Sequence, residues 1–344
     1  MTNCYIPTCY FPSTVIFIDD SRDFLLNFCL QLDDTLSYRL YDSPYEALKA
    51  LKVAQAPTQL HKHCVTEQAE TEGCPLTNQS YNVDLAAIHW EVYNPQRFNE
   101  ISVVVVDYDM PGINGLELCE KLADSPVKKI LLTGLADEKI AIKAFNHGLI
   151  DCFVKKNDPN ITELINESII ALQRDYFRGM SDLIVKMLSV KGVRCLQDPV
   201  FADFFEKLCR QHNITEYYLT ENTGSFLLLD INAKPSCLIV KNREDLNHYC
   251  ELAIDNQASP EVIEQLRSGE AIPYFWQADG ALQNEWSDWS SYLHPAQRLE
   301  GHDTYFYAFV DNPHSFDIQA DKIMSYNDYL SLQDEVGAQD QTSI

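Results

Sequence analysis

Short apolar runs alternate with segments of helical periodicity through the first half of the chain. Runs rich in β-branched and aromatic residues predict strands at 13–20, 37–42, 101–107, 128–134 and 151–156. Apolar residues at helical spacing predict intervening helices at 21–32, 43–54, 115–124 and 136–148. A polar stretch interrupts this alternation near 54–97, where only 83–94 favours a short helix. A long amphipathic helix is predicted from Pro159 to about Lys191.

Strands that alternate with helices favour a parallel sheet with right-handed crossovers and helices on both faces. We therefore expect a doubly wound, five-stranded α/β domain with a flavodoxin-like sheet over residues 12–158, carrying an insert at about 54–97. Residues 159–198 are expected to form a helical connector.

The second half of the chain has a different order of elements. A helix is predicted from residue 199, and two further helices at 243–255 and 260–268. Strands are predicted at 215–222, 224–231, 235–241, 272–276 and 304–310. Turn signals such as Asn222-Thr223-Gly224 separate the first three of these strands, which favours an antiparallel sheet. We expect an α+β domain with a PAS-like outline over 199–330, followed by an acidic tail at 331–344.

Composition excludes several classes of function. The formal net charge is −25, and residues 191–344 carry 10 Lys and Arg against 25 Asp and Glu. Such a surface repels phosphates, so direct DNA binding through a basic face is not expected. No apolar run is long enough to span a membrane, and the N-terminus has no basic segment typical of a signal peptide. The 11 scattered cysteines favour free thiols in a reducing cytoplasm.

Chemically reactive side chains stand at the ends of the predicted parallel strands. Asp19 and Asp20 end the first strand, Asp107 the third, Thr133 the fourth and Lys155 the last. Because the carboxyl ends of parallel strands meet at one edge of a sheet, these side chains are expected to converge. Clustered carboxylates repel one another, and a hard divalent cation with oxygen ligands relieves that repulsion.

The pieces IDD (18–20), DYDMPGINGLE (107–117), LLTG (131–134) and FVKK (153–156) together resemble the receiver domain of two-component response regulators. The resemblance implies that Asp107 accepts a phosphoryl group from a sensor histidine kinase. It implies that Asp19, Asp20, Asp107 and the backbone carbonyl of Asp109 hold Mg²⁺. It also implies that Thr133 and Lys155 contact the phosphoryl oxygens, and that the protein is not an enzyme beyond its own phosphorylation and dephosphorylation.

The chain departs from the receiver pattern in three places. Lys156 stands where the family usually has proline after the lysine. Cys152, with Phe153 next to it, stands where an aromatic ring three residues before that lysine often moves upon phosphorylation. The insert makes the Asp20–Asp107 spacing long; we expect an interaction loop there, with Zn²⁺ binding by His61, His63, Cys64 and Cys74 as the alternative.

The second half is rich in aromatic residues but lacks the motifs of a phosphate loop, a nucleophile elbow or a helix-turn-helix. Core packing explains such residues. The alternative is a pocket for a planar ligand such as a nucleotide, lined by Tyr274, Trp276, Trp289 and Tyr305, which would make this half a phosphorylation-gated nucleotide-binding or nucleotide-processing domain.

The stretch 216–241, with IPYFW (272–276) and YLHPAQRLEG (292–301), is similar to the output regions of gammaproteobacterial response regulators of the Legionella quorum-sensing type. That resemblance implies a role in quorum sensing and homodimer formation upon phosphorylation.

Overall fold

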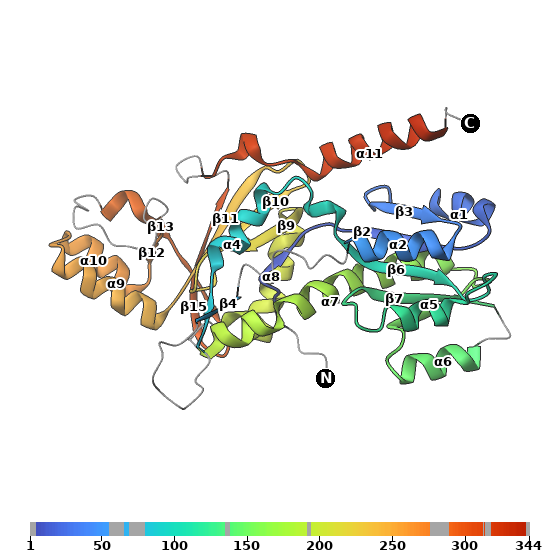
Figure 1. Ribbon diagram of the computed structural model, residues 1–344. Helices are drawn as coiled ribbons and strands as arrows, with labels where there is room; N and C mark the ends of the chain where they lie inside the picture. Colours follow the sequence, from blue (N-terminus) through green and yellow to red (C-terminus); the bar gives the residue numbers. More distant parts are fainter. Residues whose placement is uncertain are drawn as a thin grey trace. The chain divides into compact units, whose positions relative to one another are not determined.

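The computed structural model describes residues 5–54, 65–68, 80–134, 138–190, 194–275, 289–311, 313 and 318–341. The chain divides into two compact units (Figure 1). Each unit is formed by three segments that are not consecutive in the sequence. The receiver unit comprises 11–62, 95–180 and 329–344, and the output unit comprises 1–10, 63–94 and 181–328. Both units are therefore discontinuous in sequence, whereas the periodicity divides the chain into successive segments.

A five-stranded parallel sheet forms the centre of the receiver unit, in the order β3-β2-β6-β7-β8. Its strands are β2 (Thr14–Ile18), β3 (Tyr38–Tyr41), β6 (Ile101–Asp107), β7 (Lys128–Thr133) and β8 (Cys152–Lys155). β6 is buried on both faces, as its unbroken run of β-branched residues predicts. The expected doubly wound, flavodoxin-like sheet is confirmed.

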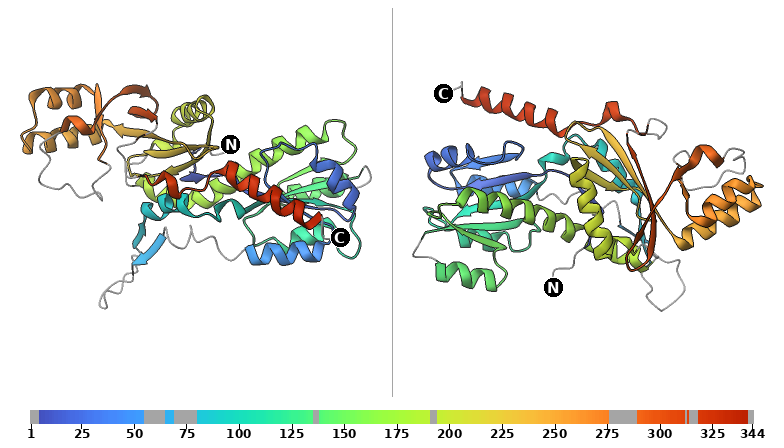
Figure 2. Two further views of the ribbon diagram at one scale, coloured as in Figure 1. Left: turned by 90° about the horizontal axis from the view of Figure 1, so that it is seen from above. Right: turned by 180° about the vertical axis from the view of Figure 1, so that it is seen from behind.

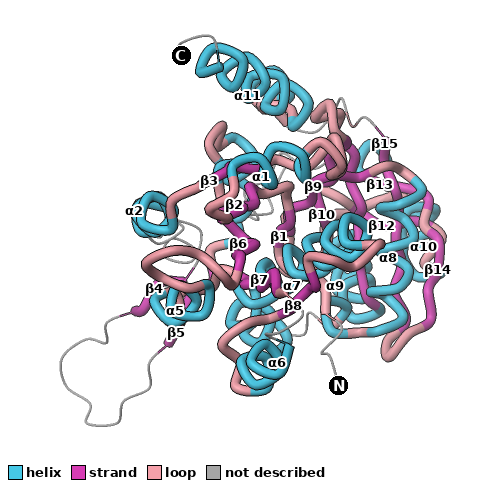
Figure 3. The backbone as a smooth tube through the Cα atoms, turned by 90° about the vertical axis from the view of Figure 1, so that its right-hand side faces the viewer, coloured by secondary structure: helices cyan, strands magenta, loops and turns pink. Residues whose placement is uncertain are grey.

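Helices cover both faces of this sheet, as the end-on view of Figure 3 shows. They are α1 (Arg22–Cys29), α2 (Pro44–Ala54), α5 (Gly115–Lys121), α6 (Glu138–Asn146) and α7 (Ile161–Val190). α1 and the first half of α7 pack on one face, against residues such as Val103 and Val105. α2 and α5 pack on the other face, against Val104 and Val106, and α6 joins α5 there. Alternate residues of β6 therefore serve opposite cores.

The output unit contains a six-stranded antiparallel sheet in the order β1-β9-β10-β11-β15-β14. Its strands are β1 (Cys9–Tyr10), β9 (Ile214–Leu219), β10 (Phe226–Asp230), β11 (Pro235–Asn242), β14 (Gln297–Glu300) and β15 (Thr304–Asp311). The antiparallel sheet is confirmed, but one member differs from expectation. The predicted strand at 272–276 is only β12 (Ala271–Pro273), which pairs with β13 (Leu293–Pro295) in a separate two-stranded sheet.

β1 comes from a segment that precedes the receiver unit in sequence, and it pairs with β9 through Cys9 and Tyr10. Two residues are too few to show a strand period, so the sequence carries no signal for this pairing. The helices α8 (Pro199–Gln211), α9 (Arg243–Asp255) and α10 (Pro260–Ser268) form where their periodicity predicts them. Short 3₁₀ turns lie at Cys195–Gln197, Trp289–Tyr292 and Ala320–Lys322.

The described part of the insert is ordered rather than a plain loop. β4 (Val65–Gln68) and β5 (Ser80–Val83) form an antiparallel hairpin, and α4 (Leu85–Trp90) follows it. Asp84 caps α4 by accepting a hydrogen bond from the backbone N–H of Ala86. α4 packs against β9, so this part of the insert belongs to the output unit. Two 3₁₀ turns, Glu91–Tyr93 and Arg97–Asn99, then lead to β6.

The C-terminal segment is helical. The sequence predicts an acidic tail at 331–344, and α11 (Tyr326–Gln341, red in Figure 2) extends through most of these residues. From residue 329 onward this helix belongs to the receiver unit. The sequence of α11 is rich in polar residues and shows no apolar face that would predict burial. Tyr329 is nevertheless buried and contacts the receiver unit.

Candidate functional site

Three carboxylates converge at the carboxyl edge of the receiver sheet. Asp19 and Asp20 follow β2, and Asp107 ends β6, the neighbouring strand. Each offers a carboxylate oxygen within 4.8 Å of the others. Asp19 and Asp107 are buried, with 1% and 4% of their surface exposed, and Asp20 is exposed. Two buried carboxylates beside an exposed one are a fitting donor set for a hard divalent cation that enters from solvent.

An ammonium group joins the two buried carboxylates. Nζ of Lys156 lies 2.6 Å from Oδ2 of Asp19 and 2.9 Å from Oδ1 of Asp107. It also lies 4.7 Å from the centre of the Phe24 ring on α1, within cation–π distance. The other oxygen of Asp19 accepts a hydrogen bond from the backbone N–H of Ser21. The pair of buried negative charges is thus compensated by one shared positive charge.

Lys155, the lysine predicted to stand at this site, does not reach it. Its Nζ lies 3.0 Å from Oε2 of Glu138, at the start of α6. Successive residues of a strand point to opposite faces, and Lys155 follows Phe153 toward the face that α6 covers. Lys156 lies one residue beyond β8, where its side chain extends over the strand ends. The role of Lys155 at the phosphoryl group stays a prediction, and Lys156 is the lysine that lies beside the carboxylates.

Electrostatic surroundings shift both partners of the central ion pair. Burial raises the pKa of Asp107, and the nearby charge of Asp19 adds to this, although Lys156 and the backbone N–H of Asp109 act in the opposite direction. Burial by itself would lower the pKa of Lys156, but its hydrogen bonds to Asp19 and Asp107 outweigh burial and raise it. Lys156 therefore keeps its positive charge at neutral pH.

Thr133 ends β7, next to β6, and is fully buried. Within the described residues, its hydroxyl has no hydrogen-bond partner. A buried hydroxyl without a partner costs free energy, so such groups are rare unless a ligand or a second conformation satisfies them. An anion attached to Asp107 would supply the missing acceptor.

The predicted switch residues Cys152 and Phe153 lie on opposite faces of β8. The sulfur of Cys152 lies 3.6 Å from the hydroxyl oxygen of Ser168 on α7. Phe153 packs on the α6 side, where its ring contacts Phe145 edge to face at 6.4 Å between centroids. Phe153 stands three places before Lys156, and Cys152 stands three places before Lys155. The switch roles of both residues stay predictions.

Gly115 is a residue of the site that the sequence reasoning missed. It begins α5, and a Cβ at this position would collide with the backbone carbonyl oxygen of Asp107. Asn114 and Glu117 form a reciprocal capping box around it. The Asn-Gly pair directly before a helical run was the available signal, because only glycine allows the helix to start so close to the strand end.

Comparisons with known proteins agree with this geometry. Residues 72–166 match the model of the response regulator receiver domain. The solved structure of the Legionella pneumophila response regulator LqsR is 51% identical, covers 95% of both chains and superimposes with a TM-score of 0.80. The chain belongs to the response regulator family. No protein with a curated description matches this response regulator.

Other solved structures match this response regulator over about half of its length. An adenylate cyclase structure from Rhodopirellula baltica is 19% identical, covers 53% of this chain and 98% of its own, and has a TM-score of 0.33. A response regulator receiver domain protein from Methanospirillum hungatei is 15% identical, covers 49% of this chain and 98% of its own, and has a TM-score of 0.31.

The remaining candidate residues of the response regulator fall into two groups. His61, His63, Cys64, Cys74 and Trp276 lie outside the described residues. Three residues of the candidate planar-ligand pocket are described. The ring of Trp289 packs against Phe275, whereas the Tyr305 hydroxyl donates to Asp198. Burial raises the pKa of Tyr274 far above its usual range. A nucleotide pocket at these residues stays a prediction.

Among the helices that the structure describes, none is long and apolar enough to cross a membrane.

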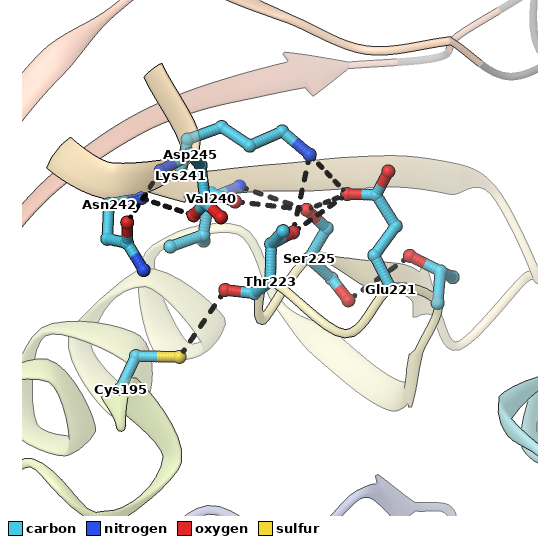
Figure 4. Close-up of polar contacts among 9 residues, drawn as sticks. Cys195, Glu221, Thr223, Ser225, Val240, Lys241, Asn242 and Asp245 are labelled. Carbon is cyan, nitrogen blue, oxygen red and sulfur yellow. Dashed lines mark hydrogen bonds and ion pairs between the residues drawn. The ribbon is translucent and has the colours of Figure 1, made fainter. Parts of the chain in front are cut away.

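The output unit contains a second buried ion pair, which Figure 4 shows. Nζ of Lys241, on β11, is fully buried and lies 2.8 Å from Oε2 of Glu221 in the turn between β9 and β10. The same carboxylate oxygen accepts hydrogen bonds from the hydroxyls of Thr223 (3.1 Å) and Ser225 (2.6 Å). Burial opposes the charge of Lys241, but Glu221 outweighs it and the pKa of Lys241 is raised. Each polar group here has a protein partner, which is typical of a structural pair.

Proposed function

We propose that Asp107 accepts a phosphoryl group from the phosphohistidine of a sensor histidine kinase. In this step an oxygen of the Asp107 carboxylate bonds to phosphorus, the bond between phosphorus and the histidine nitrogen breaks, and the imidazole takes up a proton. The observation that carries the proposal is the cluster of Asp19, Asp20 and Asp107 at the carboxyl edge of the sheet, with Lys156 paired to Asp19 and Asp107.

Mg²⁺ would be held by Asp19, Asp20, Asp107 and the backbone carbonyl of Asp109, and would shield the incoming phosphoryl charge from the carboxylates. These residues fit Mg²⁺, because they offer oxygen ligands and a hard divalent cation prefers oxygen. The residues of the chain perform the rest. Lys156 holds a positive charge beside the acceptor oxygen of Asp107, so it is placed to pair with a phosphoryl oxygen after transfer.

Thr133 and Phe153 carry the state of the site outward in this proposal. The Thr133 hydroxyl, which has no partner among the described residues, donates to a phosphoryl oxygen and draws its loop toward Asp107. Phe153, on the α6 side of β8, then repacks into the space that the loop leaves. Two packings separated by a few kcal/mol suffice for such a switch.

We further propose that phosphorylation favours a homodimer and that the protein acts in quorum sensing in the cytoplasm, without direct DNA binding through a basic face. The identity to LqsR over nearly the whole chain supports a role shared with that response regulator. The excess of Asp and Glu in residues 191–344 supports an output other than binding to phosphate backbones.

The test measures the mass in solution by light scattering and the phosphorylation of Asp107 by mass spectrometry. Both are recorded with and without acetyl phosphate and Mg²⁺, on the native chain and on Asp107→Asn. We expect phosphate on native Asp107 and a doubled mass, with neither change in the variant. Phosphate at Asp107 with constant mass would overturn dimerisation alone. No phosphoryl uptake by the native chain would overturn the proposed function.

A further inference from the structure

The C-terminal helix α11 occupies a shaped polar site on the receiver unit, at the opposite edge of the sheet from Asp107. Tyr329 is its buried anchor, with only 6% of its surface exposed. The Tyr329 ring packs on Phe98, with 5.1 Å between centroids. Its hydroxyl donates to Oδ1 of Asn99 at 2.9 Å, and Arg39 donates to the same oxygen at 2.8 Å.

A network of hydroxyls completes this site. Thr14, the first residue of β2, is fully buried and donates to the backbone carbonyl of Phe98 at 2.8 Å. The hydroxyl oxygen of Ser37 lies 3.0 Å from that of Thr14, and Ser37 donates to Oε1 of Gln333 at 3.0 Å. Gln333 in turn donates to the Tyr329 hydroxyl at 2.6 Å. Tyr329 and Gln333 therefore both contact hydroxyl groups of the receiver unit.

Each hydroxyl has a single proton to donate, so the network has few alternatives. With the Thr14 proton given to the backbone, the Ser37 proton goes to Gln333 and the Tyr329 proton to Asn99. Removal of α11 would take away the Gln333 oxygen that accepts the hydrogen bond from Ser37. Water could replace these hydrogen bonds with a small net change in free energy. A polar contact of this kind is therefore easier to open than a contact between apolar side chains.

The sequence of α11 is a poor helix former without this support. It carries Gly337 in its interior and Asp340 near its C-terminus, and it has no Lys or Arg. Glycine in a helix interior costs helix stability, and a segment without Lys or Arg gains nothing from cations near its C-terminus. A short isolated helix is already marginal in water. Its order thus depends on the contacts of Tyr329 and Gln333.

We propose that α11 is a releasable strap, helical while Tyr329 is docked on the receiver site of Thr14, Ser37 and Asn99. The chain enters α11 from the output unit, since residues up to 328 belong there and Asn327 donates its backbone N–H to Ile231. Within the receiver unit, the docked Tyr329 contacts Thr14 at the start of β2 and Asn99 in the turn before β6. Those are the two strands whose far ends carry Asp19 and Asp107, and the inference does not depend on phosphoryl transfer.

Hydrogen–deuterium exchange of the full chain, read on peptides that cover residues 326–341, tests the strap. Tyr329→Ala removes the anchor, and Ser37→Ala removes one donor from the receiver side. Leu332→Ala is the matched control, because Leu332 lies on the same helix and is 49% exposed. Peptides from β7 and β10 report whether each unit stays folded.

We expect Tyr329→Ala to accelerate exchange in α11 at least about tenfold, the factor that corresponds to one lost hydrogen bond or more. Ser37→Ala should accelerate it by a smaller factor, and Leu332→Ala should stay within about twofold of the native rate. β7 and β10 should keep their native exchange. Native exchange of α11 in both Tyr329→Ala and Ser37→Ala would overturn the strap, as would equal acceleration by Leu332→Ala. If Tyr329→Ala unfolds the receiver, Ser37→Ala alone decides by the same criteria.

Discussion

Nζ of Lys156 lies 2.9 Å from Oδ1 of Asp107, whereas its neighbour Lys155 is paired with Glu138 on α6. Two consecutive lysines therefore serve different partners on different sides of β8. This separation makes them a natural pair of test and control, since the same substitution can be made at adjacent positions with different expected results.

Lys156→Ala should weaken the binding of beryllofluoride, a phosphoryl mimic, in the presence of Mg²⁺ by about 10- to 100-fold, because a charge-assisted hydrogen bond is lost. Lys155→Ala should change the affinity by less than about threefold, since an exposed ion pair contributes little. Isothermal titration calorimetry measures both. A loss at Lys155→Ala as large as that at Lys156→Ala would contradict the assignment of Lys156.

Thr133→Val tests the buried hydroxyl. Valine keeps the shape and removes a polar group that has no partner among the described residues, so the free energy of unfolding should stay within about 1 kcal/mol of native or rise. The beryllofluoride affinity should fall about tenfold, because the bound anion loses a donor. Urea unfolding and calorimetry give the two values.

Thr133→Ser is the control for this substitution, because it keeps the hydroxyl and should keep most of the affinity. A clear loss of stability in Thr133→Val without a change in anion binding would mean that the hydroxyl serves the fold and not the ligand.

Lys241→Met tests the buried ion pair of the output unit. The substitution leaves Glu221 without its cation and should cost about 3–5 kcal/mol in the free energy of unfolding. Adding Glu221→Gln should recover part of that loss, since the uncompensated charge disappears. Lys234→Met is the control, because Lys234 pairs with Asp311 at the surface and should cost no more than about 1 kcal/mol. Equal losses in the free energy of unfolding for Lys241→Met and Lys234→Met would show that burial does not make the Lys241–Glu221 pair more important than a surface pair.

Asp198→Asn should reveal a pH-dependent contribution to stability. Burial alone would raise the pKa of Asp198, but the backbone N–H groups of His302 and Val200 and the Tyr305 hydroxyl outweigh it and lower that pKa. A lowered pKa in the folded state gives stability that is present above the unfolded pKa, about 4, and is lost as the pH falls through the folded pKa.

Urea unfolding of the Asp198→Asn variant at pH 7 and at successively lower pH measures this contribution. The variant should be less stable than the native chain by about 1–3 kcal/mol at pH 7, and the difference should shrink as the pH falls below about 4. Asp203→Asn is the control, because Asp203 is exposed and pairs with the exposed Lys207. A difference that is the same at every pH would show that the charge of Asp198 is not what stabilises the fold.

The sequence alone determined the receiver sheet and most of its reactive edge. Each strand of this sheet is a local apolar run, and Asp19, Asp107 and Thr133 stand at the ends of such runs. Because the carboxyl ends of parallel strands meet at one edge, the pattern of runs is enough to predict that these residues lie together. The helices at 243–255 and 260–268 were equally local, with Asn242 and Ser259 as caps.

Tertiary structure decided what depends on register or on distant partners. Lys155 and Lys156 are indistinguishable in sequence, and only the end of β8 and the direction of each side chain separate their roles. The pairing of β1 with β9 and the docking of Tyr329 beside Thr14 join residues that are far apart in the chain. Such contacts leave no periodic pattern, because the free energy that selects them comes from groups hundreds of residues away rather than from neighbours.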